Sequence, residues 1–428
     1  MIKQLYNLAA IFLILGIGQS LPGQQAFDAR AAGMAFSNGA DTRGLQSVGL
    51  NPATLALKND FKFEFNLFSV NATANNNSFR KSQYDEYFTT GKRLTSRDIQ
   101  DILNSIPEKG LRVDGFARVN TLAFYMPNFS ISFVGMGVAT ATVPRSAFEL
   151  PLNGNGDPGR VYNLDNADGG DWVGTGVVMS GALPLWSRPE ATLDFFSLGA
   201  TVKYITGYHY IQVEKSTGQL RDFSLAANDP YVYLNGEMEI FSSEGGKGFG
   251  ADFGALATFD EKFTVGLTVL NLASSIKWNV RTEKQLLSIR GDSLSLPNRV
   301  QDSLIVHRDT TVSIGSFGSR LPTVLDLALA YRASQHFLLA AEYEQGLNDR
   351  MGGTTRARVA AGLEYTGLPV LPLRAGFTYG AQTGSSLALG FGVDLKNWYL
   401  DFAYLNHGSV ILGDFKGMGL AISSRLRF

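Results

Sequence analysis

The sequence predicts an all-β protein, a transmembrane antiparallel β-barrel of about 14 strands with an N-terminal plug inside its lumen. Three observations support this prediction: repeated segments in which apolar and polar side chains alternate, an apolar N-terminal stretch with the features of a secretory signal, and a last segment that alternates up to a final phenylalanine. In such a barrel the apolar side chains face lipid and the side chains between them face the lumen.

Composition removes several other classes of protein. The 428 residues include 37 basic and 38 acidic side chains, for a net charge of −1, and no cysteine. The balanced charge argues against a nucleic-acid partner, which would require a basic excess. Without cysteine there is no disulfide framework and no cysteine-ligated metal site. Outside the N-terminus no apolar run is long enough for a membrane helix, so a secreted soluble β-protein and a membrane barrel remain.

The first residues predict a signal peptide that ends near residue 23. The stretch "MIKQLYNLAAIFLILGIGQSLPGQQA" has Lys3, an apolar run over residues 8–17 and small residues at 20–23, which is the order found in secretory signals. A membrane anchor is the alternative. The apolar run is shorter than the ~20 residues that a spanning helix needs, so we expect removal of residues 1–23.

Residues 24–60 separate this signal from the first strand and contain the turn "NPA", Asn51, Pro52 and Ala53. Pro52 restricts its own φ angle, biases Asn51 away from the helical region and lacks an N–H group. A turn of this kind would have its polar backbone shielded from lipid if it folded inside a barrel. We therefore expect residues 26–57 to lie in the lumen as a plug, with a periplasmic tail as the alternative.

The same segment resembles the N-terminal hatch of the FadL-like family of outer-membrane channels for hydrophobic compounds. The resemblance rests on a small-residue start, Asp41, and Asn51-Pro52-Ala53 followed by Leu55; it continues weakly through "GADFGALATFDEKFTVGLTVLNL", residues 250–272, which is also similar to PorV-like relatives of the type IX secretion system. It implies passive diffusion of long-chain fatty acids or other apolar molecules through a hatch-gated lumen, with lateral exit through the wall. Only Asn51, Pro52 and Ala53 can be matched to the family's motif.

The strands themselves are predicted from alternation with a period of two residues. We count about fourteen to sixteen, within the range of such barrels, and no domain boundary interrupts residues 61–428. The earlier strands are 61–73, 115–125, 130–143, 173–183, 195–206, 231–240, 248–259 and 262–272, and the later ones lie near 325–331, 337–343, 357–365, 373–379, 387–395 and 398–404.

The polar face of these strands favours a barrel over a soluble β-sandwich, because it consists of glycine, alanine and charges of both signs rather than the Thr, Ser and Lys of a solvated surface. Such charges either neutralise one another in a packed interior or guide a solute, and the mixed signs predict no strong ion selectivity. Tyr331, Tyr343, Tyr365, Tyr379 and Trp398 lie near strand ends as a candidate interfacial girdle. The charges expected to face the lumen are Lys203, Asp326, Glu342, Arg356, Arg358, Glu364, Arg374, Asp394, Asp401, Arg425 and Arg427.

Three segments depart from the strand pattern. Residues 95–106 predict a helix, with Thr95 or Ser96 as its cap and one apolar face. This helix either packs over a strand connection or folds into the barrel mouth or lumen. Residues 150–171 predict a loop, and residues 274–323 a loop excursion or an extended hairpin.

Motifs for catalysis or metal binding are weak, and we predict no enzyme activity, cofactor or metal. "GDSLSLP", residues 291–297, matches the box of GDSL-type esterases around Ser293, but no downstream histidine has the aspartate three residues earlier that this family uses. Asp165, Asp168 and Asp171 could ligate calcium, although their spacing is not that of an EF-hand.

The last segment, "GMGLAISSRLRF", places Met418, Leu420, Ile422, Leu426 and Phe428 on one face. It resembles the terminal strand by which bacterial outer-membrane barrels are recognised, so Leu426 and Phe428 are the expected signal for the barrel assembly machinery.

These features predict a protein of the bacterial outer membrane that transports hydrophobic small molecules such as long-chain fatty acids. The alternative is a non-transporting structural or docking component of the envelope or of a secretion system. An apolar path beside the plug would favour the first, and a lumen closed by paired charges beneath large loops would favour the second. Outer-membrane lipid and a fatty acid or other hydrophobic ligand are the expected partners, and the oligomeric state stays open.

Overall fold

The computed structural model describes residues 27–153, 159–165, 167–189, 191–222, 231–295, 305–381 and 384–428, and side chains at 222, 231–232, 292–295 and 305 are not described. The predicted signal peptide and the side chain of Ser293 lie outside this part of the chain. Within it, no helix is both long and apolar enough to cross a membrane.

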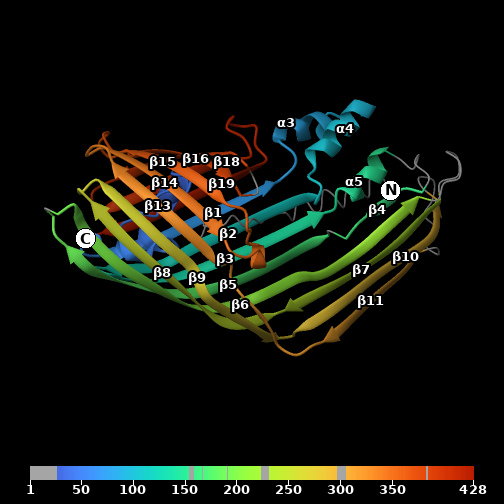
Figure 1. Ribbon diagram of the computed structural model, residues 1–428, viewed down its shortest axis with the longest axis horizontal. Helices are drawn as coiled ribbons and strands as arrows, with labels where there is room; N and C mark the ends of the chain where they lie inside the picture. Colours follow the sequence, from blue (N-terminus) through green and yellow to red (C-terminus); the bar gives the residue numbers. More distant parts are fainter. Residues whose placement is uncertain are drawn as a thin grey trace.

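Fourteen antiparallel strands of the described chain form a closed barrel wall, as the sequence predicted. The wall closes where the first strand pairs with the last, with Glu64 opposite Arg427 (Figure 1). In order, the wall strands are β1 (Glu64–Asn76), β2 (Leu111–Met126), β3 (Phe129–Val143), β5 (Asp168–Ser187), β6 (Leu193–Asp222), β8 (Gly245–Phe259), β9 (Phe263–Val280), β13 (Val324–Arg332), β14 (Phe337–Gly346), β15 (Arg358–Tyr365), β16 (Leu373–Gly380), β17 (Ser386–Asp394), β18 (Trp398–His407) and β19 (Gly417–Arg427).

The outer face of the wall is apolar, as a lipid-facing surface requires. In β13, Leu327 and Leu329 are 44% and 52% exposed, whereas Asp326 and Ala328, which alternate with them, are buried. Aromatic rings pair across neighbouring strands near one end of the barrel, with ring centroids 4.4 Å apart for Phe263 and Tyr331. A closed barrel with this outer surface is a protein of the bacterial outer membrane.

The two ends of the barrel differ in the length of their connections. At one end, which we call the short-turn end, β2 joins β3 and β17 joins β18 through only a few residues. At the other, the long-loop end, residues 77–110 connect β1 with β2, and residues 408–416 connect β18 with β19. Since barrels of this class have short periplasmic turns and long extracellular loops, the short-turn end faces the periplasm. The C-terminus lies there (Figure 1).

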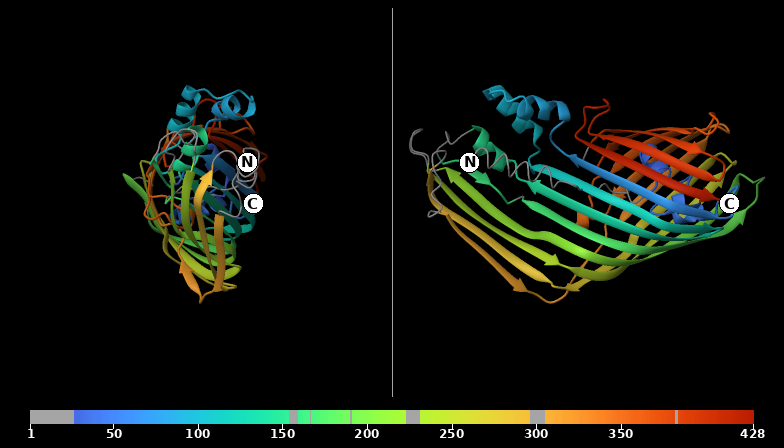
Figure 2. Two further views of the ribbon diagram at one scale, coloured as in Figure 1. Left: turned by 90° about the vertical axis from the view of Figure 1, so that its right-hand side faces the viewer. Right: turned by 180° about the vertical axis from the view of Figure 1, so that it is seen from behind.

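Short helices rise above the wall at the long-loop end (Figures 1 and 2). Helix α4 begins at Ser96, and Thr95 is its N-cap: the Thr95 N–H and hydroxyl donate to the Asp98 carboxylate and lower the pKa of that group. Its apolar face buries Ile102 and Leu103. The helix lies within the β1–β2 connection and stands above the wall, outside the lumen (Figure 1). The helices at this end are α3 (Lys81–Tyr84), the π-helix η3 (Asp85–Thr89), α4 (Ser96–Ser105) and α5 (Ser146–Asn153).

Part of the sheet continues past the wall at the same end. Beyond its pairing with β8, the long strand β6 pairs with β7 (Tyr231–Ser243), which pairs with β10 (Glu283–Ser295), which in turn pairs with β11 (Ile305–Ser313). Most of the predicted excursion over 274–323 is therefore an extended hairpin, and the predicted strand at 231–240 is not part of the wall. Side chains of β11 from Val306 onward are exposed on both faces, so its sequence carries no apolar alternation. The remaining short strands are β4 (Val161–Asn163) and β12 (Phe317–Ser319).

Candidate functional site

Residues 27–57, which we call the N-terminal segment, lie inside the barrel in its short-turn half (Figures 1 and 2). The segment folds into α2 (Ala29–Gly33), η1 (Gly44–Ser47) and η2 (Pro52–Ala56). Helix α2 begins after Asp28, whose carboxylate accepts from the Arg30 N–H at 2.7 Å. Nearly every residue of the segment is buried, although the helices are too short to form a core of their own. Their burial is provided by the barrel wall.

The Asn-Pro-Ala turn joins the segment to two strands of the wall. The Asn51 side chain accepts from the Ala53 N–H at 2.9 Å, which caps η2, and donates to the Ala255 carbonyl of β8 at 3.0 Å. The Ser197 hydroxyl of β6 donates to the Ala53 carbonyl at 2.9 Å. Pro52 is the first residue of η2, where its missing N–H has no consequence.

Glycines of the wall allow the segment to approach this closely. A Cβ atom on Gly376 of β16 would lie 2.4 Å from the Met34 carbonyl carbon and 2.6 Å from the Ala35 nitrogen. A Cβ atom on Gly254 of β8 would lie 2.1 Å from the Asn51 Oδ1 atom. These are contacts that a real side chain cannot make, so glycine on the inner face of the wall is a requirement of the packed segment.

Replacing Gly376 by valine should therefore displace the N-terminal segment without breaking the barrel. Overpacking of this kind costs roughly 1–3 kcal/mol, and the rigid wall leaves movement of the segment as the response. We expect protease added to the purified protein to cut within residues 27–57 of G376V and to spare them in the wild type. Gly135, whose added Cβ would meet nothing within 4 Å, supplies the matched control G135V. Equal protection of the segment in both variants would contradict the close fit.

A continuous chain of buried ion pairs links the segment to five wall strands. The Arg30 guanidinium donates to both oxygens of Glu364 on β15, at 2.8 Å and 2.6 Å. The Arg374 guanidinium on β16 bridges Glu364 and Asp401, at 2.7 Å to each. We call this set the ion-pair network. Negative and positive side chains alternate along it in the order Asp41, Arg30, Glu364, Arg374, Asp401 and Arg425. Arg425 also contacts Asp28 and Glu64, and Glu64 pairs with Arg427.

A second group of charges lies beneath the loop that follows α2. Arg358 of β15 donates to the Ala35 carbonyl at 2.8 Å and pairs with Glu344 at 2.9 Å. Glu342 pairs with the same guanidinium at 3.3 Å and accepts from the Gly39 N–H at 3.0 Å. In each group the charged side chains pair among themselves and also hold the N-terminal segment.

The structure places most of the predicted lumen charges on the inner face and differs at two of them. Arg356 precedes β15 and is exposed, and Asp394 is half-buried at a turn, where it accepts from the Lys396 N–H. Lys203 forms a separate pair with Asp252 at 2.8 Å. The predicted charges that are buried inside the wall are Lys203, Asp326, Glu342, Arg358, Glu364, Arg374, Asp401 and Arg425, with Arg427 largely buried at the edge.

Sequence reasoning missed the partners that the N-terminal segment supplies, Asp28, Arg30 and Asp41. Their signal was available, since they are charges in an otherwise small and apolar stretch that was expected inside a lumen. Glu64 was also missed, although it lies on the polar face of its predicted strand. Glu344, one residue beyond the predicted strand 337–343, was missed as well. What the sequence could not show is which carboxylate faces which guanidinium, because that depends on strand register.

An aromatic cluster fills the lumen in the long-loop half. Trp278 of β9 is fully buried, its indole N–H donates to the Ser319 hydroxyl at 2.8 Å, and its ring lies 4.9 Å from that of Tyr210. Met351, carried inward by the β14–β15 connection, accepts from the Trp172 indole at 3.4 Å through its carbonyl oxygen. The cluster consists of Phe116, Val138, Trp172, Ile205, Tyr210, Ile276, Trp278, Leu321 and Met351, with Met136, Phe241 and Phe317 packed against it.

The other predicted motifs form no shared site among the described residues. Asp171 pairs with His209 at 2.9 Å, Asp168 accepts from Gln212, and Asp165 accepts from the Gly218 N–H. Leu426 lies opposite Phe65 and Trp398 in the sheet. The Phe428 backbone continues that pairing, donating to the Phe63 carbonyl at 2.9 Å. The role of Leu426 and Phe428 in assembly stays a prediction.

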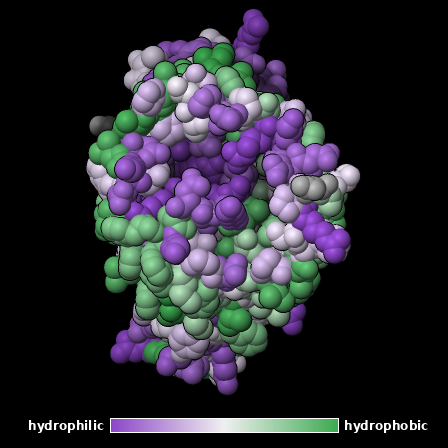
Figure 3. Space-filling model, turned by 90° about the vertical axis from the view of Figure 1, so that its left-hand side faces the viewer, coloured by the Kyte–Doolittle hydropathy of each residue, from purple (hydrophilic) through white to green (hydrophobic). Residues whose placement is uncertain are grey.

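At the short-turn end the opening of the barrel is hydrophilic. Figure 3 views this end and shows a hollow surrounded by hydrophilic residues. The lumen thus combines an aromatic half toward the outside with a charged, occupied half toward the periplasm.

Comparison with solved structures shows a shared barrel fold at low sequence identity. A monoaromatic hydrocarbon channel, the TodX deltaS2S3 mutant, matches with a TM-score of 0.56 at 13% identity, covering 95% of this chain and 100% of that one. A FadL homologue of Pseudomonas aeruginosa matches with a TM-score of 0.51 at 13% identity, covering 96% and 100%. The toluene transporter TbuX of Ralstonia pickettii matches with a TM-score of 0.50 at 12% identity, covering 94% and 99%. The chain therefore has the fold of FadL-type channels.

Sequence comparison assigns the family. No curated protein matches this chain. The model of a family of unknown function, DUF5723, matches residues 52–402, which include the Asn-Pro-Ala turn from Pro52 onward, the wall strands from β1 to β17 and the first half of β18. Because this match spans most of the chain, the protein is a member of the DUF5723 family.

Proposed function

We propose that the protein is an outer-membrane channel for the passive entry of hydrophobic small molecules, with the N-terminal segment as its plug. One observation carries this proposal. A single closed wall encloses an aromatic cluster in its long-loop half and a buried, ion-paired segment in its short-turn half. Apolar side chains on the extracellular side of a removable closure are the arrangement that a gated channel for apolar solutes needs.

The chemistry of the two halves supports apolar solutes rather than ions. The cluster brings aromatic and apolar side chains together with few polar groups among them, and this is the composition typical of sites for small organic ligands. The charges below them occur in both signs and are consumed in pairs, so they offer no uncompensated field for one kind of ion. The structural neighbours named above are described as channels for monoaromatic hydrocarbons and toluene, which makes a substituted benzene a suitable probe.

Quenching of tryptophan fluorescence by bromotoluene tests directly whether a ligand binds at the aromatic cluster. The chain has four tryptophans, of which Trp172 and Trp278 lie in the cluster and Trp186 and Trp398 do not. In the double variant W186F/W398F we expect quenching that saturates with bromotoluene concentration, because the ligand binds beside the two remaining indoles. The reverse variant W172F/W278F is the control and should show only quenching that rises linearly, from bromotoluene dissolved in lipid.

Transport itself requires a second measurement, in intact bacteria that lack their own channel for hydrophobic compounds. Cells that express the protein should take up labelled toluene faster than cells with an empty vector. Saturable quenching without faster uptake would mean that the protein binds the ligand at the aromatic cluster but does not transport it.

The same uptake measurement separates the second candidate function, a docking component of the envelope. That alternative is favoured by the helices α3, α4 and α5 and by strands β7, β10 and β11, which project beyond the wall, with Phe241 of β7 packed against the aromatic cluster. Uptake equal to the empty vector, together with linear quenching in W186F/W398F, would favour docking over transport.

A further inference from the structure

Three carboxyl groups meet in the lumen beside the loop of the N-terminal segment that follows α2. Asp326 of β13 lies opposite Glu344 of β14 in the sheet, and Glu342 is on the same face of β14. All three side chains are buried, and one oxygen atom of each lies within 4.8 Å of the other two. Asp326 and Glu342 are close enough to hydrogen bond to each other. We call these three residues the carboxylate cluster.

Positive charge does not match negative charge in this cluster. The Arg358 guanidinium pairs with Glu344 at 2.9 Å and with Glu342 at 3.3 Å. No ion pair recorded among the described residues reaches Asp326. Arg118 of β2 also acts on Glu344 across the lumen, but no recorded ion pair joins the two. The Oε1 atom of Glu344 is buried and accepts no hydrogen bond within the described part of the chain.

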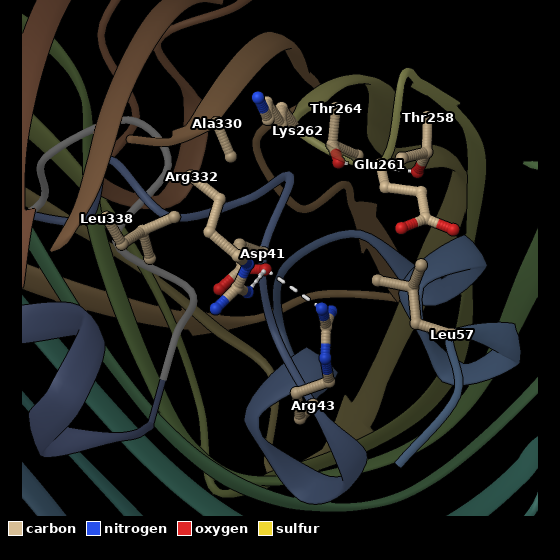
Figure 4. A pocket seen from close by; sticks show the side chains of 10 residues that line it. All are labelled: Asp41, Arg43, Leu57, Thr258, Glu261, Lys262, Thr264, Ala330, Arg332 and Leu338. Carbon is tan, nitrogen blue, oxygen red and sulfur yellow. Dashed lines mark hydrogen bonds and ion pairs between the residues drawn. The ribbon is translucent and has the colours of Figure 1, made fainter. Parts of the chain in front are cut away.

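A different balance holds where the same segment meets the ends of β13 and β14. Asp41 contacts Arg43 at 3.0 Å and Arg332 at 2.9 Å (Figure 4), and Arg30 at 3.2 Å. Guanidinium groups outnumber the carboxylate there, so no further positive charge is needed. The carboxylate cluster has the opposite composition. Carboxyl groups that share a buried site do not all ionise at neutral pH, and a hydrogen bond between two of them requires a proton on one.

The cluster is coupled to the N-terminal segment through backbone groups of the segment. Glu342 accepts from the Gly39 N–H at 3.0 Å, and Arg358 donates to the Ala35 carbonyl at 2.8 Å. We propose that Asp326 and Glu342 share a proton while the segment is in place, and that loss of this proton at alkaline pH releases the segment. Repulsion between the two ionised groups then moves Glu342 away from Gly39. The inference rests on the proposed function, because it assigns a regulation to the plug.

The direction of the pH effect follows from the number of protons that each state binds. In the closed state the cluster holds the shared proton. In the open state its carboxyl groups reach water, where such groups ionise near pH ~4. The closed state therefore binds one more proton, so it is favoured at lower pH and is lost as the pH rises. Because one proton is released, the ratio of open to closed protein should rise by at most about tenfold per pH unit.

Planar-bilayer recording and proteolysis of the full-length protein test this release between about pH 6 and about pH 9, well above the range of carboxyl groups in water. In the wild type, both the open probability and cleavage within residues 27–57 should rise with pH. In D326N an amide replaces the protonated carboxyl group, so the segment should stay protected and the channel closed over the whole range. The control D394N removes an aspartate at a turn, which accepts from the Lys396 N–H, and should keep the pH dependence of the wild type.

Infrared spectroscopy of the protein in lipid nanodiscs tests the shared proton without any channel activity. At neutral pH the wild type and D394N should show the C=O stretching band of a protonated carboxyl group, which is lost at alkaline pH and weakened in D326N. A wild-type spectrum without this band at neutral pH would overturn the shared proton. A band that titrates while protection of the segment does not change with pH would overturn the release. Absence of toluene uptake in a protein whose segment is released at alkaline pH would contradict the channel alone, so the two failures are distinguishable.

Discussion

Deleting residues 27–57 is expected to raise the single-channel conductance of the protein in planar bilayers several-fold. The deletion removes no wall strand, and the closing pair of β1 and β19 begins only at Glu64, so the barrel should still insert. It empties the short-turn half of the lumen and leaves Glu364, Arg374, Asp401 and Arg425 lining it. These charges would then face water instead of a dry, packed interior. Charged side chains around a water-filled lumen are the usual lining of an open porin.

Pro52→Gly provides a graded comparison for this deletion. Glycine restores backbone freedom at the first residue of η2 and loosens the turn without removing it, so intermittent openings should appear between long closed periods. A deletion variant that inserts normally and conducts no more than the wild type would show that the segment does not close the pore. The docking function would then be the better explanation of the fold.

Replacing Arg30 by methionine should release the N-terminal segment more completely than any other single substitution within it. Arg30 connects Asp41 to Glu364, and both carboxylates are buried. Removing one partner of a buried ion pair costs about 3–5 kcal/mol where the other charge is left uncompensated. Here Glu364 keeps Arg374 and Asp41 keeps Arg43, so the cost should be smaller, but the side-chain link from the segment to β15 is lost. In R30M we therefore expect frequent channel openings, rapid proteolysis within residues 27–57, and an unchanged barrel as judged by heat-modifiable migration in gels.

Arg30→Lys is the matched control for R30M. A lysine keeps the positive charge but cannot donate to both Glu364 oxygens in the forked geometry of a guanidinium, so its effect should lie between those of the wild type and R30M. If R30M retained a protease-resistant segment and closed channels, the ion-pair network would have no part in holding the segment. The glycine contacts at Gly254 and Gly376 would then be the remaining means of retention.

The alternation of side chains was sufficient to predict the wall. In β13, leucine at 325, 327 and 329 against Asp326 and alanine at 328 and 330 predicts both the strand and the direction of each side chain, because a strand in a barrel separates lipid from lumen residue by residue. The same logic failed for β11, whose side chains from Val306 onward meet solvent on both faces. A strand exposed on both faces does not require alternating apolar and polar residues, and its sequence shows no such alternation.

The sequence by itself therefore determined the class of the fold, the inner face of most wall strands and the unusual character of the Asn51-Pro52-Ala53 turn. Only the tertiary structure decided which groups meet. Arg30 and Glu364 are 334 positions apart, and their contact depends on strand register and on the depth at which the N-terminal segment lies. Burial makes such a pairing strongly dependent on geometry, since each charge must find its partner within hydrogen-bond distance to offset the loss of water, and no local pattern in a sequence encodes that distance.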